Sequence, residues 1–115
     1  MNNRQVGSRY ESMAADYLIS QGYEIISRNY QNHRRGEIDL IAREQGILIF
    51  VEVKYRKTLK SGDPGEAVGV RKQQRIRTAA LSYLYENRLS LDTPCRFDVV
   101  TVLGEEIRLI RDAFR

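Results

Sequence analysis

The chain has 115 residues, 42% of them hydrophobic and 30% charged, with a formal net charge of +4. These values indicate one globular domain over residues 1–115 and exclude a disordered chain of low hydrophobicity. The longest apolar run is Ile47 to Val51, and the start, MNNRQVGSRY, lacks the apolar core of a secretory signal, so we expect a cytoplasmic protein.

The first predicted element is an amphipathic helix. Between residues 6 and 18 the apolar positions recur at spacings of three and four, and Gly22 is well placed to end the helix. Strand-like runs follow at residues 23–30, 37–43 and 47–56. Gln45 and Gly46 separate the last two runs, which predicts a hairpin.

The second half of the chain predicts a helix and two more strands. DPGE at residues 63–66 resembles a helix start, and a second apolar stripe runs from Val70 to Asn87. Residues 96–103 and 106–114 then alternate as two closing strands. The order α-β-β-β-α-β-β predicts an α/β fold, in which a central mixed sheet of about five strands is flanked by helices.

The connection through the second helix sets the expected order of the sheet. A strand, a helix and another strand favour a right-handed crossover, so the strand starting near Arg96 is expected to lie parallel to the one ending near Arg56. Residues 47–53, ILIFVEV, are almost continuously apolar, which is typical of a central strand.

Four charged residues interrupt the apolar hairpin: Glu37, Asp39, Glu52 and Lys54. A loop centred on residues 45–46 pairs positions whose numbers sum to 91, which sets Asp39 opposite Glu52. The same register sets Glu37 opposite Lys54, and strand alternation places all four side chains on one face. A three-residue loop would shift this register.

This register predicts a metal site. Two carboxylates that lie close together in a partly dry setting repel each other, unless one is protonated or a cation binds between them. Mg²⁺, or Mn²⁺ in its place, suits Asp39 and Glu52 because it takes oxygen ligands and keeps waters for chemistry. Lys54 can steady the pair, orient an attacking water and stabilise charge on a phosphate. The alternative is a solvated ion-pair ladder, in which Glu37 is only a counter-charge for Lys54.

Two further observations restrict the chemistry. His33 and Cys95 are the only histidine and cysteine, which excludes a His-centred triad, a His-rich metal cage and an internal disulfide. Residues 36–52 carry a local net charge of −3, whereas residues 54–77 carry eight basic and two acidic side chains. An acidic cluster followed by a basic segment suits a polyanion held over a metal site.

The motifs GEIDLI, FVEVKYR, GEAVGVRKQQR and RFDVV, together with GSRYESMAADYL near the start, cover essentially the whole chain. In this combination they resemble the bacterial YraN-type family of small predicted endonucleases. That family is similar to archaeal Holliday junction resolvases and belongs to the restriction-endonuclease-like PD-(D/E)XK superfamily. The resemblance implies a mixed sheet flanked by helices and Mg²⁺-dependent cleavage of DNA. Ile38 stands where the superfamily motif has proline.

The resemblance also implies roles for particular residues. Asp39 and Glu52 match the acidic metal ligands, Lys54 matches the lysine of the motif, and the main-chain carbonyl of Val53 is the usual extra ligand. Glu11 matches an acidic residue that approaches the metal in resolvase-like relatives, often through a water molecule. Without the resemblance, a solvated position on the helix surface would be the simpler interpretation of Glu11.

We therefore predict a metal-dependent endonuclease acting on DNA, with branched DNA among the candidate substrates. Phosphate contacts are expected from six basic residues: Arg34, Arg35, Arg56, Lys57, Lys72 and Arg75. Symmetric cutting of a junction would require a homodimer. Two alternatives remain open, a non-catalytic nucleic-acid-binding accessory protein that retains the fold and a structural interaction module.

Overall fold

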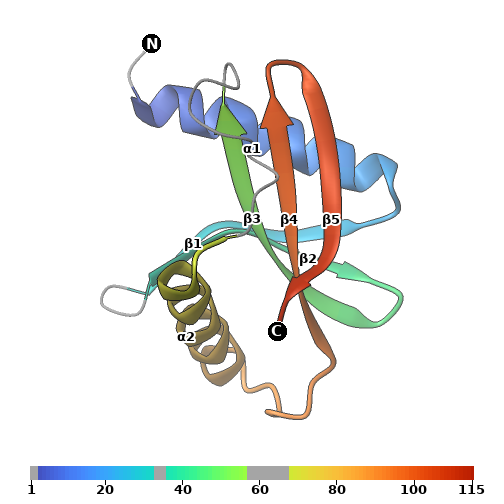
Figure 1. Ribbon diagram of the computed structural model, residues 1–115. Helices are drawn as coiled ribbons and strands as arrows, with labels where there is room; N and C mark the ends of the chain where they lie inside the picture. Colours follow the sequence, from blue (N-terminus) through green and yellow to red (C-terminus); the bar gives the residue numbers. More distant parts are fainter. Residues whose placement is uncertain (1–2, 33–35, 57–67) are drawn as a thin grey trace.

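A computed structural model describes residues 3–32, 36–56 and 68–115 of the chain. Its elements have the predicted order: α1 (Asn3–Ser20), β1 (Glu24–Asn32), β2 (Gly36–Glu44), β3 (Ile47–Arg56), α2 (Val70–Glu86), β4 (Cys95–Leu103) and β5 (Glu106–Phe114) (Figure 1). The predicted helix start at residues 63–66 lies outside the described residues. None of the helices in the described part is long and apolar enough to cross a membrane.

The strands form one five-stranded sheet in the order β1-β2-β3-β4-β5. β3 pairs with β4 in parallel, and the other neighbouring strands are antiparallel. The helix between β3 and β4 therefore forms the crossover that the sequence predicts, and β3 is central. The α/β fold with a mixed sheet is confirmed.

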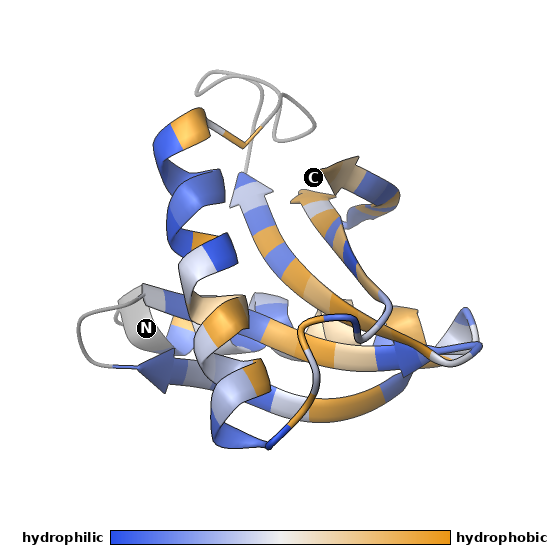
Figure 2. Ribbon diagram, turned by 90° about the horizontal axis from the view of Figure 1, so that it is seen from below, coloured by the Kyte–Doolittle hydropathy of each residue, from blue (hydrophilic) through white to orange (hydrophobic). Residues whose placement is uncertain are grey.

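The two helices cover opposite faces of this sheet (Figure 1). Side chains alternate along β3, so Ile49, Val51 and Val53 pack with α1, whereas Leu48 and Phe50 pack with α2. Burial on both faces explains the nearly unbroken apolar run of β3, which appears as a mostly hydrophobic band in Figure 2. Glu52 follows Leu48 and Phe50 on the α2 face of the same strand.

The turn between β2 and β3 sets the register on which the site depends. Gln45 and Gly46 both have positive φ, +51° and +78°, as a two-residue hairpin turn of type I′ requires. Glu44 pairs with Ile47 across this turn, and the ladder continues to the pair Leu40 and Val51. The predicted register is confirmed over all these rungs.

Gly36, at the start of β2, lies close to the backbone of α2. Its φ is +103°, and a Cβ built there would lie 3.0 Å from the backbone oxygen of Arg75. No side chain fits this position without backbone movement, because both the conformation and the space disfavour it. This contact holds the N-terminal half of α2 against Gly36, which precedes Asp39 by three residues in β2.

We expect Gly36→Ala to lower the free energy of unfolding by about 1–3 kcal/mol, from left-handed strain and the contact with Arg75. Thermal unfolding measures this loss. Gly46→Ala is the matched control, since Gly46 also has positive φ but its Cβ would meet nothing within 4 Å. An equal loss in both variants would show that the close approach of α2 contributes nothing.

Candidate active site

Asp39 and Glu52 lie where β2 and β3 separate. They occupy the rung after Leu40 and Val51, where the ladder between the two strands stops. Instead of strand pairing, the Oδ2 of Asp39 accepts a hydrogen bond of 2.8 Å from the backbone N–H of Val53. The N–H and C=O of one residue point to the same side of a strand, so the carbonyl of Val53 also faces β2.

The environment of this pair disfavours negative charge. Glu52 is only 9% exposed, and burial, followed by the nearby charge of Asp39, raises its pKa to about 8. Burial also raises the pKa of Asp39, although the Val53 N–H and the charge of Lys72 oppose this rise. The charge of Lys72 opposes the rise at Glu52 as well. Without a bound cation, the pair retains a proton at neutral pH.

Lys72 comes from α2 and forms an ion pair with Glu52. Its Nζ lies 3.5 Å from Oε1 of Glu52, and its side chain is 41% exposed. The sequence predicted Lys72 as a phosphate contact and gave the steadying role to Lys54. Within the described residues, no ion pair of Lys54 is found, and Lys72 is the ammonium beside the carboxylates.

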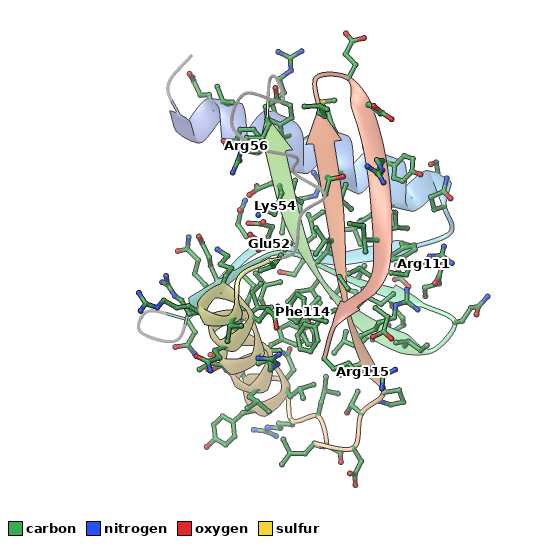
Figure 3. All side chains as sticks on the ribbon, viewed as in Figure 1. Glu52, Lys54, Arg56, Arg111, Phe114 and Arg115 are labelled. Carbon is green, nitrogen blue, oxygen red and sulfur yellow. The ribbon has the colours of Figure 1, made fainter. Side chains whose placement is uncertain are left out.

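Lys54 is half-buried and lies two residues beyond Glu52, so strand alternation places both side chains on the α2 face. Figure 3 shows Glu52, Lys54 and Arg56 following one another along β3 towards its C-terminal end. The side chain of Arg56 folds back, and its Nη1 donates a hydrogen bond of 2.7 Å to the carbonyl of Tyr55.

Glu11 reaches the pair from the other helix. Burial and the charge of Asp39 raise the pKa of Glu11. The side chain of Asn29 opposes this rise. The structure places Glu11 near Asp39, and the role of Glu11 at a metal that the family resemblance implies stays a prediction.

Asn29 was missed by the sequence analysis. It has φ +54° inside β1, and its neighbours Arg28 and Tyr30 pair with Leu40 and Ile38 on either side of Asp39. A non-glycine residue in this conformation inside a strand is strained, and such residues cluster at functional sites. Asparagine tolerates this conformation better than most residues, but its presence in the run SRNYQN predicted only a strand.

The predicted pairing of Glu37 with Lys54 is wrong. The β2–β3 ladder ends at Leu40, and the Oε2 of Glu37 instead accepts a hydrogen bond of 3.4 Å from Gln31 on β1. The strands separate because the N–H of Val53 donates its hydrogen bond to the carboxylate of Asp39. The backbone of β2 would otherwise accept this bond in the next rung of the ladder. Glu37 therefore borders a polar groove of about 450 Å³ beside Glu11. The other residues lining this groove are Gly7, Ser8, Asn29 and Gln31.

Comparison with known proteins relates this arrangement to one family. The family model described as "Uncharacterised protein family UPF0102" matches residues 10–102. The chain belongs to the UPF0102 family. This is the YraN-type family that the sequence motifs resemble, and the resemblance is confirmed.

Several UPF0102 proteins are similar over nearly their whole length. The UPF0102 protein of Lachnoclostridium phytofermentans is 55% identical over 114 residues, which cover 99% of this chain and 96% of the relative. Those of Natranaerobius thermophilus and Caldicellulosiruptor bescii are 45% and 46% identical. In both cases the match covers 99% of this chain and 100% of the relative. The family description assigns no activity.

The donors at the site of this UPF0102 protein suit a cation held by two carboxylates. No group of three or more His, Cys, Asp and Glu side chains within the described ranges has the geometry to hold a metal ion. Mg²⁺ often uses only one or two carboxylates and keeps several waters. Asp39 and Glu52 provide that pair, and their raised pKa values reflect the cost of bringing two carboxylates together without a cation.

The basic residues predicted to contact phosphate have different positions. Arg75 is exposed on α2, one turn beyond Lys72. The hydrophilic colour covers most of the N-terminal half of α2 in Figure 2. Arg34, Arg35 and Lys57 lie outside the described residues, so their predicted contacts remain predictions.

Proposed function

We propose that this UPF0102 protein is a metal-dependent endonuclease that hydrolyses DNA phosphodiester bonds, with branched DNA among its substrates. One observation carries the proposal: the half-buried Asp39 and the buried Glu52 lie together at the separated ends of two central strands, where Lys72 forms an ion pair with Glu52. A protein that only binds nucleic acid gains nothing from two partly desolvated carboxylates whose charges repel each other, because their desolvation costs free energy.

In this mechanism, Asp39, Glu52 and the carbonyl of Val53 would hold Mg²⁺ or Mn²⁺, with Glu11 assisting through Asp39 or through a water. When bound, the ion would supply Lewis-acid activation of the phosphate and a more acidic water. Lys54 would orient the attacking water and donate to the charge that develops on the phosphate oxygens.

The surrounding basic residues would hold the DNA backbone without reading its sequence. Arg56 extends the line of β3 side chains beyond Lys54, and Arg75 extends the α2 face beyond Lys72. Arg34, Arg35 and Lys57 are adjacent in sequence to these strand ends and complete the proposed phosphate-binding set. Two symmetric cuts in a four-way junction would further require a homodimer.

A cleavage assay tests this function. Wild-type protein with Mg²⁺ or Mn²⁺ is expected to cut at least one of four substrates: linear, nicked, flapped or four-way DNA. Asp39→Ala and Lys54→Ala should each lower the rate by at least about a hundredfold, because each removes a group that acts on the reacting phosphate. Gel electrophoresis of end-labelled DNA measures the products.

A non-catalytic accessory protein would behave differently in the same assay. It would bind DNA with a strong dependence on salt, cut none of the four substrates, and bind equally well with and without Mg²⁺. Binding of this kind, unchanged in Asp39→Ala, would replace the nuclease proposal with the accessory one.

A further inference from the structure

The ion pair between Lys72 and Glu52 joins a flexible cation to the carboxylate that is the proposed metal ligand. Nζ lies 3.5 Å from Oε1, on a side chain that is 41% exposed, whereas the side chain of Glu52 is 11% exposed. The ammonium therefore lies at the solvent side of a buried acceptor. The lysine side chain has four methylene groups joined by rotatable bonds. Its ammonium can therefore move away from Glu52 without movement of α2.

The position of Lys72 on its helix shows that Glu52 is what stabilises the ammonium there. Lys72 is in the first turn of α2, where the positive end of the helix dipole disfavours a cation. No acidic residue lies in this first turn. The carboxylate of Glu52, which comes from a different element, is the ion-pair partner of Lys72 among the described residues.

A divalent ion at this site and the ammonium would compete for the same carboxylate. Both cations would lie close to Glu52, and two cations a few ångströms apart repel each other in a partly buried site. Binding of the metal therefore favours release of Lys72. The released ammonium would lie one helical turn from Arg75, where a DNA phosphate would supply the negative charge that Glu52 no longer offers it.

We propose that Lys72 is an exchangeable cation, which occupies Glu52 in the metal-free protein and moves to a DNA phosphate when the metal binds. The inference rests on the proposed nuclease function. It assigns different roles to the two lysines: Lys54 acts at the reacting phosphate, and Lys72 couples metal binding to DNA binding. Lys72 is thus a positioning residue for the substrate and a competitor of the metal.

The test measures Mn²⁺ binding by calorimetry in the absence of DNA. Lys72→Met keeps the length of the side chain and removes its charge, so Mn²⁺ should bind about three- to tenfold more tightly. Damage to the site would lower the affinity instead, so an increase separates competition from a structural role. Lys72→Arg keeps the charge and is expected to bind Mn²⁺ about as wild type does.

The second measurement is DNA affinity with Ca²⁺, which fills the site without supporting rapid cleavage. Lys72→Met is expected to bind DNA about three- to tenfold more weakly and to release about one fewer counterion. Arg75→Met is the matched control from the same helix face. It should weaken DNA binding but leave Mn²⁺ affinity unchanged, because no ion pair joins Arg75 to Glu52 in the described residues.

The outcomes separate this inference from the proposed function. If wild type binds Mn²⁺ and cuts DNA, but Lys72→Met binds Mn²⁺ no more tightly, the exchange is wrong and the nuclease function stands. If Mn²⁺ affinity rises equally in Arg75→Met, the effect is general electrostatics and the exchange is also wrong. If wild type binds no divalent ion, the inference and the proposed function fail together.

Discussion

Glu52→Gln is expected to unfold at a higher temperature than wild type at pH 8, in the absence of metal, and to lose cleavage activity. Glu52 is buried beside Asp39, and its pKa is raised to about 8 by burial and by that neighbouring charge. Glutamine has nearly the same shape, carries no charge, and can donate a hydrogen bond to Asp39. It removes the repulsion that the ionised pair would otherwise impose on the fold.

The sign of the pH dependence follows from the raised pKa. Glu52 binds its proton more tightly in the folded protein than in the unfolded chain, so its contribution to stability is present below about pH 4.5. This contribution is lost as the pH rises towards about 8. The advantage of Glu52→Gln should therefore be small at pH 5 and reach about 3–6 °C at pH 8. The lost ion pair with Lys72 reduces the gain but does not reverse it, because Lys72 is 41% exposed.

Thermal unfolding between pH 5 and pH 8, with and without Mg²⁺, measures both effects. Mg²⁺ should raise the unfolding temperature of wild type at pH 8 and leave that of Glu52→Gln unchanged, because the variant lacks one of the two carboxylates. Cleavage should fall by at least about a hundredfold. Glu105→Gln, at an exposed position in the β4–β5 turn, is the control and should change neither property. A variant less stable than wild type at pH 8 would contradict the electrostatic argument.

The centre of the site could be predicted from the sequence because the two-residue turn sets which residues of β2 and β3 pair with each other. Once Gln45 and Gly46 form the two-residue turn, the rungs from Glu44–Ile47 to Leu40–Val51 follow, and Asp39 and Glu52 come next after the last rung. The alternation of β3 then places Lys54 on the face of Glu52. These steps use only local rules of strand geometry.

The residues that were missed or misplaced depend on contacts between distant elements. Asn29 takes a strained backbone conformation beside Asp39, and no local pattern in β1 indicates this. Lys72 looks like surface charge in the sequence, because its partner Glu52 lies twenty positions earlier and on another element. The predicted pairing of Glu37 with Lys54 assumed that the regular ladder continues. It ends before that pair, because Asp39 accepts the hydrogen bond of the Val53 N–H. In each case, tertiary packing overrides the regular geometry of one element.

Asp98→Ala is expected to produce the largest loss of stability among the variants considered, about 3–5 kcal/mol. Asp98, on β4, is completely buried and accepts four hydrogen bonds. The donors are the hydroxyl of Tyr23 at 2.7 Å, Nε and Nη2 of Arg96 at 2.8 and 3.0 Å, and the backbone N–H of Asp112 at 3.0 Å. Removing the carboxylate takes this acceptor from the Tyr23 hydroxyl, Nε of Arg96 and the Asp112 N–H, and leaves a cavity at a completely buried position.

This buried carboxylate differs from Asp39 and Glu52 in its neighbours. Arg96 lies in direct contact with Asp98, and the pKa of Arg96 is raised by that hydrogen-bonded carboxylate. Burial and Asp98 raise the pKa of Tyr23 to about 12, so the phenol remains a neutral donor. Four donors satisfy the two oxygens, which leaves no place for a metal. We therefore interpret Asp98 as a structural residue that joins the end of α1 to β4 and β5.

Urea-induced unfolding measures the expected loss, which is a large fraction of the total stability of about 5–15 kcal/mol for a domain of this kind. Tyr23→Phe removes one donor and should cost only about 1 kcal/mol, since the carboxylate keeps three others. Asp98→Asn keeps the shape and some acceptor capacity and should fall between the two. In Asp98→Asn, the Mn²⁺ affinity of the folded protein should equal that of wild type. A change in that affinity would place Asp98 in the metal site and contradict its structural role.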